Sequence, residues 1–514
     1  MFGSLDVDRD SEGFRSRWIW IIPPFIVLGL AATLVMVSLA DHVGVTRAAL
    51  GLVIAPFALV LVVIGLRRGF ALLNKMRARL GHWDVLWLLL FASALVFRVR
   101  SATDIRANPV DSWAVYRIAL EVGVGVVLFT HLVLRRPEWL GSMFRGFIGA
   151  LTAFGIVSLA STAWSVYPAW TLYKSCEYLL DVALLAAILV TIRSARAYKH
   201  FVNWTWVLYG LLLLSVWLGV VVWPQQELYP VGFKIGLLGV RLTGVVPDVS
   251  SNDVGTFGAI LALVSLCRLL PIAGRSSERI WYTLLFTAST ATMILSQTRS
   301  AMAGFLFGVF LMLLFSKRLG LSAFLSFVVG PLLLLTSLGG LVWAFLKRGE
   351  TAQVLGTLSS RTIWWSYALQ KFLERPLTGF GAYAAGRFAV LATHGLTVTS
   401  TLHSDYLEII VGTGIWGLIP ALAALLGTWW FLVRYLQRSS EATLERQLAY
   451  EAVAVLGLLT FRSIFMTMLT WHPPLDFLVI LGTAEFLRRR EIRETSHPVQ
   501  APDESSADAA TVCS

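Results

Sequence analysis

Charged residues are scarce in this chain of 514 residues. Asp, Glu, Lys and Arg together make up only 14% of it, whereas about a quarter is usual in soluble globular domains. The hydrophobic residues, 57% of the chain, are gathered into blocks of roughly 17–25, which is the length that an α-helix needs to cross a bilayer. The composition therefore excludes a soluble globular protein and predicts an all-α polytopic membrane protein.

Cysteine is rare too, and the three cysteines lie in separate segments, at Cys176, Cys267 and Cys513. No two of them have the short spacing of a zinc site or of a disulfide framework. We accordingly expect no metal site and no cofactor. The sequence also lacks a basic tract interleaved with aromatic residues, so the net charge of +12 does not indicate a nucleic-acid partner.

About fourteen apolar segments are predicted to cross the membrane. The first is too long for the apolar core of a cleaved signal peptide, and we expect it to be retained. The segments are 18–40, 48–66, 83–97, 118–134, 147–163, 175–192, 201–222, 254–270, 280–295, 300–316, 321–346, 405–433, 448–470 and 474–487. Because the ends of such segments shift easily, the prediction is 12–14 transmembrane helices.

The distribution of lysine and arginine predicts the orientation. With the N-terminus inside, every short inner loop is basic, as the positive-inside rule requires. The long polar segment 347–404 then faces outward, towards the periplasm or the cell exterior. We expect a cytoplasmic N-terminal segment, an N-terminal bundle, a functional core, C-terminal helices and a disordered cytoplasmic tail that is too polar to bury apolar area. These parts are 1–17, 18–234, 235–433, 434–487 and 488–514, in that order.

Four polar clusters remain on the outer side, at 240–253, 295–301, 361–365 and 403–408. In the second, Arg299 interrupts a nearly continuous apolar stretch, with only Ser, Gln and Thr around it. An arginine at the bilayer centre costs about 2.5–3.5 kcal/mol, and near the interface its stem can snorkel. Arg299 is therefore either an interfacial anchor or a ligand for an anion.

The third cluster opens an expected amphipathic helix on the outer surface. Ser360 can cap this helix, and Pro376 stops it. At its start, Arg361 meets either lipid headgroups or a substrate. The glycines at Gly379 and Gly381 are expected to form a tight turn.

The fourth cluster begins with His403, immediately before an apolar segment. This histidine either caps the following helix or takes a proton from a hydroxyl group, because an imidazole titrates near pH 6.5. Asp405 and Glu408 are the alternative bases. Charged residues inside predicted spans usually face the bundle and find partners there. Three such residues have no predicted role: Arg462, Asp181 and Glu121.

Together the clusters resemble the O-antigen ligase and polymerase superfamily of bacterial envelope glycosyltransferases. The resemblance covers roughly residues 235–430. The matching segments are Arg241-Leu-Thr-Gly through Asn252, Leu-Ser-Gln-Thr-Arg299-Ser-Ala, Arg361 through Pro376-Leu-Thr-Gly379-Phe-Gly381, and His403-Ser-Asp-Tyr-Leu-Glu through Gly414-Ile-Trp-Gly417. The chain departs from the family pattern at three places. Ser404 replaces an Asn, Gly412 replaces a Glu, and Pro247 is not adjacent to Asn252.

This resemblance implies a helical bundle similar to that of membrane glycosyltransferases and a metal-independent glycosyl transfer at the outer face of the inner membrane. The donor is similar to a glycan on undecaprenyl diphosphate, and the acceptor is a sugar hydroxyl. The implied catalytic residues are His403, as general base, and Arg299, which neutralises the diphosphate. The implied substrate-binding residues are Arg241, Asn252, Arg361, Asp405 and Tyr406.

Three functions remain open. A polymerase joins repeat units of an O-antigen, capsule or exopolysaccharide, and the number of predicted spans favours it. A ligase transfers the finished glycan to lipid A core by the same chemistry. A transporter or flippase of lipid-linked glycan is the third, although the polar clusters lie in loops on one side, without an apparent repeat. A chain-length regulator and a flippase are the expected protein partners.

Overall fold

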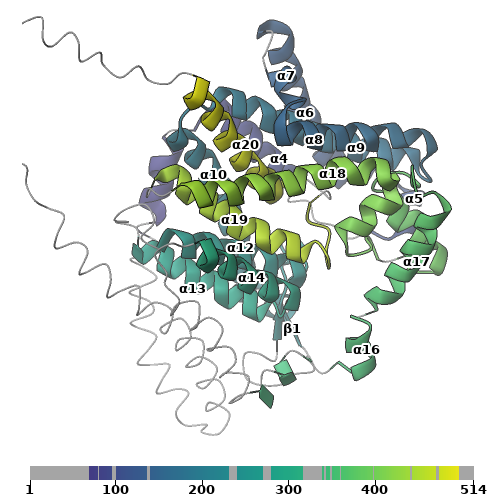
Figure 1. Cartoon of the computed structure of the whole chain (residues 1–514). Helices are drawn as coiled ribbons and strands as arrows, with labels where there is room; N and C mark the ends of the chain where they lie inside the picture. Colours follow the sequence, from purple (N-terminus) through teal and green to yellow (C-terminus); the bar gives the residue numbers. More distant parts are fainter. Residues whose placement is uncertain are drawn as a thin grey trace, which may run out of the picture.

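The computed structural model (Figure 1) describes residues 67–496 with interruptions, and the statements below concern these residues. The omitted positions within this range are 68, 79, 95–99, 136–138, 231–239, 270–278, 316–338, 341–342, 346, 348–349, 359, 398, 440–442 and 470–473. The predicted segments 1–17, 18–40 and 48–66, most of 321–346, and the tail from 497 onward lie outside the described residues.

Most of the described structure is helical, and the prediction of an all-α polytopic membrane protein is confirmed. The first half contains α4 (His82–Ala94), α5 (Ala102–Ala107), α6 (Ser112–Arg135), α7 (Trp139–Met143), α8 (Gly146–Ala160), η1 (Ser161–Trp164), α9 (Pro168–Thr191), α10 (Ala195–Val222) and α11 (Pro224–Glu227). The second contains α12 (Ser251–Leu269), α13 (Arg279–Leu295), α14 (Arg299–Phe315), α16 (Ala352–Gly356), α17 (Arg361–Glu374), η3 (Ala385–Leu391), η4 (Ala392–His394), α18 (Asp405–Arg438), α19 (Leu444–Arg462) and α20 (Leu475–Ser496). Two short antiparallel strands, β1 (Leu228–Pro230) and β2 (Val240–Leu242), precede α12.

Among the described residues, five helices are long and apolar enough to cross a membrane. They lie at 112–134, 146–164, 195–220, 251–269 and 405–438. Other predicted spans are helices that are shorter, such as α14, or that carry several charged residues, such as α9 with Lys174, Glu177 and Asp181. The total of 12–14 spans therefore stays a prediction.

The long helix α18 lies at the centre of the bundle. It packs along α8, while α19 packs against α14 and α12 against α13 (Figure 1). The same view shows α5 and α17 at one end of the molecule, close to the start of α18. This end carries Arg361, His403, Asp405 and Tyr406, whereas Arg241, Asn252 and Arg299 lie on β2, α12 and α14.

A break in α18 at Gly414 admits the segment that follows α17. Gly414 has φ 63°, and the carbonyl oxygens of Pro376 and Leu377 accept hydrogen bonds from the amides of Ile415 and Trp416. A Cβ atom on Gly414 would lie only 2.3 Å from the oxygen of Leu377. The glycine is therefore required by close backbone contact as well as by its left-handed conformation.

The neighbouring glycines make a similar contact. The amide of Gly381 donates to the oxygen of Gly412 at 2.9 Å, and a Cβ atom on Gly379 would lie 2.5 Å from the backbone of Gly412. Gly379 and Gly381 thus do more than form the expected turn, because they let the segment after α17 pack directly on α18. This contact fixes the long polar segment to the bundle.

The predicted amphipathic helix is present as α17. Trp364, Tyr367 and Phe372 pack on a buried cluster, whereas Ile363 and Leu373 are exposed. The predicted cap is wrong, since Ser360 has a left-handed backbone with φ 70° and its side chain makes no capping hydrogen bond.

The disordered tail does not begin at residue 488, and that prediction is wrong for residues 488–496. Helix α20 continues to Ser496. Pairs at helical spacing stabilise its last turns, with Arg488 and Arg489 on Glu485 and Arg490 on Glu494.

Candidate functional site

His403 lies in the turn just before α18 and has an uncommon backbone conformation. Its φ angle is 53°, in the left-handed region that costs a non-glycine residue roughly 1–3 kcal/mol. The imidazole stacks on Trp364 with 5.6 Å between ring centroids, and Nδ1 lies 3.3 Å from the sulfur of Met466. Such strained residues occur preferentially at functional sites.

Side chains from α17 and α18 hold the backbone of Leu402, the residue before His403. The amide of Leu402 donates to a Glu408 carboxylate oxygen at 2.6 Å, and the carbonyl oxygen of Leu402 accepts from the indole of Trp365 at 3.1 Å. Leu402 is itself fully buried. Glu408, which the sequence suggested as an alternative base, therefore acts in this structure as a positioning residue.

The surroundings of His403 disfavour its charged form. Burial, followed by the positive charges of Arg361 and Arg462, lowers the pKa of His403 from 6.5 to about 4. The imidazole is consequently neutral at pH 7 and has a lone pair available for a proton.

Arg462 is the functional candidate whose role the sequence left open. It ends α19, its side chain is fully buried, and its guanidinium donates to the Asn252 carbonyl oxygen at 2.6 Å and to Ser300 Oγ at 2.9 Å. Its Nε has no hydrogen-bond partner among the described residues. Arg462 thus joins the starts of α12 and α14 to the space around His403. The signal in the sequence was an arginine within an apolar segment.

Arg299 is the first residue of α14, next to Ser300. Its guanidinium lies 2.6 Å from a carboxylate oxygen of Glu350, and both side chains remain partly exposed. The preceding turn is anchored by Thr298, whose hydroxyl donates to the carbonyl oxygen of Ser251. Arg299 therefore combines its own charge with the N-terminal end of a helix, a position that favours anions.

Arg241 lies beside the same turn. It sits in β2, opposite Tyr229 of β1, and its guanidinium lies 5.5 Å from the centre of that ring. The backbone oxygen of its neighbour Val240 accepts a hydrogen bond from the side-chain Nε2 of Gln297 at 3.0 Å. The structure thus connects the first two polar clusters directly.

Asp405 and Tyr406, both predicted to bind substrate, have structural contacts. The Asp405 carboxylate is fully buried and accepts hydrogen bonds from the amides of Met468 and Leu469 at 2.5 and 2.9 Å. The Tyr406 hydroxyl accepts from Ser463 at 3.0 Å. These contacts fix the turn after α19. Met466 lies in this turn and contacts His403.

The site therefore contains a neutral imidazole with arginines around it. Arg361 and Arg462 act on His403 electrostatically, and Arg462 connects it to Asn252 and to the turn that carries Arg299. Within the described part of the chain, no group of three or more His, Cys, Asp or Glu residues is placed to hold a metal ion. This arrangement is suited to accepting a proton from a hydroxyl beside a bound phosphate group.

Part of the chain is similar to a known protein family. No curated protein matches the chain. The model of the family described as O-antigen ligase matches residues 284–422, which include Arg299, Arg361 and His403 but neither Arg241 nor Arg462. Segment 284–422 is therefore similar to the O-antigen ligase family, in line with the resemblance to the O-antigen ligase and polymerase superfamily found in the sequence.

Proposed function

We propose that the protein is a glycosyltransferase of the inner membrane that polymerises lipid-linked repeat units on the periplasmic side. The observation that carries this proposal is His403 in its strained turn against Trp364, where burial and the charges of Arg361 and Arg462 lower its pKa. Transfer of a glycosyl group from a diphosphate carrier requires a base for the acceptor hydroxyl. It also requires positively charged groups that bind the diphosphate. The O-antigen ligase match supports the same chemistry.

The proposed reaction is a direct displacement at the anomeric carbon of a glycan on undecaprenyl diphosphate. The imidazole of His403 takes the proton of an acceptor hydroxyl, whose oxygen forms the new bond to the anomeric carbon. The bond from this carbon to the diphosphate breaks, and its electron pair leaves with the diphosphate. General-base assistance of this kind contributes about 10²–10⁴-fold to a rate.

The arginines stabilise the leaving group. Arg299 is partly exposed at the start of α14 and paired with Glu350, so a diphosphate competes with that carboxylate for the guanidinium. Arg462 is buried, and it holds the start of α14 by its bond to Ser300. The two arginines therefore have different roles. Arg299 contacts the phosphate, and Arg462 positions Arg299. Arg241, Asn252 and Arg361 are the further proposed substrate contacts.

His403 provides the central test, and His394 is its matched control. His394 lies on the same polar segment, with its ring stacked on Tyr367 and its side chain exposed. With purified protein and a defined lipid-linked oligosaccharide, His403→Ala should lower the rate of chain extension by at least about 10²-fold. His394→Ala should extend chains at nearly the wild-type rate. Full activity of His403→Ala would contradict the proposal, as would a strict requirement for an added divalent metal ion.

The ligase and the flippase are distinguished by their products. A polymerase gives a ladder of longer lipid-linked glycans, whereas a ligase gives product only when lipid A core is supplied. A flippase moves a labelled lipid-linked glycan across a vesicle membrane without making a glycosidic bond. We favour the polymerase, and we expect a chain-length regulator and a flippase to act with it.

A further inference from the structure

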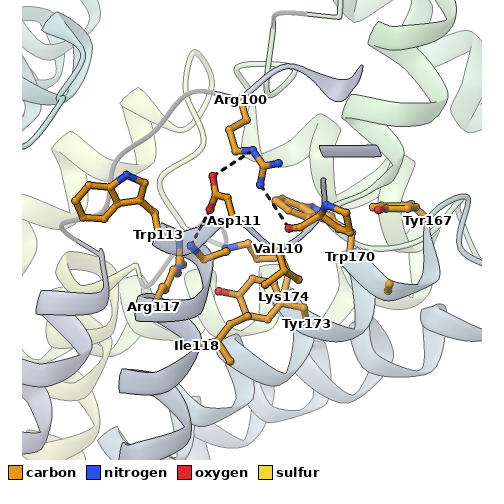
Figure 2. Close-up of a pocket in the computed structure, with 13 residues that line it drawn as sticks. Arg100, Val110, Asp111, Trp113, Arg117, Ile118, Tyr167, Trp170, Tyr173 and Lys174 are labelled. Atoms are coloured by element: carbon orange, nitrogen blue, oxygen red, sulfur yellow. Dashed lines mark hydrogen bonds and ion pairs between the residues drawn. The ribbon is translucent and has the colours of Figure 1, made fainter. Parts of the chain in front are cut away.

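A cavity of about 220 Å³ lies apart from His403, between the chain around α5, the start of α6 and the start of α9 (Figure 2). The figure shows Arg100, Asp111 and Lys174 converging on it, with Trp113 and Trp170 on opposite sides. Pockets for drug-sized ligands usually measure roughly 300–1,000 Å³. The cavity is therefore suited to a single ring of a larger ligand.

The charged groups of this cavity are already balanced. Arg100 lies 3.8 Å from Asp111, and Lys174 lies 2.6 Å from Glu177. Arg117 pairs with Glu121 and with Glu177. An anionic ligand would have to displace a carboxylate from each cation, so the charges favour a neutral ligand with many hydroxyl groups. Such a ligand can donate to the carboxylates and accept from the cations without separating the pairs.

Aromatic side chains form the other walls. Trp113, Tyr167, Trp170 and Tyr173 all line the cavity, and the side chain of Trp113 is 55% exposed at its rim. The indole Nε1 of Trp170 is shielded from solvent and has no hydrogen-bond partner among the described residues. The negative faces of aromatic rings attract the weakly positive C–H groups on one face of a sugar ring, and the free indole N–H can donate to a hydroxyl.

The segment η3 packs between residues that line the cavity and Leu402, the neighbour of His403. On one side of η3, Ala385 and Ala389 pack in a cluster with Leu402, the neighbour of His403. On the other side, Phe388 contacts Tyr167 and Trp170, with ring centroids 4.8 and 6.4 Å apart. The thickness of this one segment therefore separates the two places, and this proximity is the basis for relating them to one extended oligosaccharide.

We propose that this cavity is a subsite for a neutral sugar ring of the bound glycan, separate from the ring that reacts. The proposal rests on the proposed function for the identity of the ligand as a glycan. The open rim at Trp113 lets the rest of the oligosaccharide continue outward. The subsite selects glycans that present such a ring at a fixed distance from the reacting bond.

Binding to the complete protein in lipid nanodiscs tests the subsite directly, without a sugar-based detergent. The probe is the oligosaccharide of one repeat unit, released by mild acid from the lipid-linked precursor of the source cells, and isothermal titration measures its affinity. Trp113→Ala should weaken binding roughly 3- to 10-fold through loss of ring contact. Asp111→Asn should also weaken it, because a hydroxyl acceptor is lost. Tyr116→Ala is the matched control, as Tyr116 is exposed on the same helix and does not line the cavity.

Kinetics separates this proposal from the proposed function. Trp113→Ala should raise KM by the same factor with little change in kcat, since the sugar it contacts does not react. His403→Ala should lose transfer and keep wild-type affinity for the oligosaccharide. Equal affinities of Trp113→Ala, Tyr116→Ala and wild type in a protein that transfers glycan would overturn the subsite alone. Absence of transfer in wild type, with binding still sensitive to Trp113, would overturn the proposed function and leave the subsite standing.

Discussion

At the scale of single residues, the charge around His403 sets the pH range in which it can act. Its pKa is lowered to about 4, chiefly by burial and then by Arg361 and Arg462. A base with a lowered pKa stays neutral as the pH falls, so kcat/KM should hold constant through pH 6.5. It should decline only as the pH approaches about 4.

Arg361→Gln tests the electrostatic part of this argument. Removing a nearby positive charge makes protonation of His403 easier, so its pKa should rise and the acidic decline of kcat/KM should move to higher pH. Lys371→Gln is the control, because it removes an equal charge from the same helix α17 and Lys371 pairs with Glu374 instead. A profile of Arg361→Gln that coincides with that of wild type would contradict the assignment.

The sequence indicates the proposed base more readily than the residues that hold it in place. His403 and Arg299 were recognisable because polar residues beside apolar segments are unusual. Asp405 is equally conspicuous in the sequence, but its contacts with the amides of Met468 and Leu469 depend on a turn about sixty residues away. Arg462 was visible as a charge within a span, and only the packing of α12, α14 and α19 gives it partners.

At the scale of elements, helix positions follow from apolar length, and helix breaks do not. The predicted segment 254–270 corresponds to α12 and the segment 280–295 to α13, within a few residues. The break in α18 was not predicted, because Gly414 lies in a stretch that is apolar on both sides. The break is caused by contact with the backbone of Pro376 and Leu377, which are far from Gly414 in the sequence. A local sequence pattern cannot predict such a contact.

This contact makes Gly414 sensitive to the smallest substitution. Gly414→Ala places a Cβ atom 2.3 Å from the carbonyl oxygen of Leu377, and its left-handed φ is unfavourable as well. Gly395→Ala is the matched control, with φ 77° and no atom within 4 Å of the added Cβ. Gly395→Ala should cost only about 1 kcal/mol from backbone strain. Gly414→Ala should lower the Tm in nanodiscs by several degrees more, and equal Tm values would refute the contact.

At the scale of the whole molecule, the proposed function depends on which side of the membrane the site faces. Even the part of α18 after its break at Gly414 runs to Arg438 and, at about 1.5 Å per residue, is long enough to cross the membrane. The His403 turn precedes the first residue of α18, whereas Arg434 and Arg438 lie at its end, beside Glu491 of α20. The basic end is expected in the cytoplasm.

Cysteine labelling of intact cells decides the orientation. In a variant that lacks Cys176, Cys267 and Cys513, a cysteine replacing the exposed Ser366 of α17 should react with a membrane-impermeant maleimide added outside, once the outer membrane is made permeable. A cysteine replacing the exposed Arg438 should react only after the inner membrane is opened. Retained transfer activity in both variants serves as the control for folding. The reverse labelling pattern would place His403 in the cytoplasm, away from lipid-linked repeat units on the periplasmic side, and would rule out the proposed polymerase.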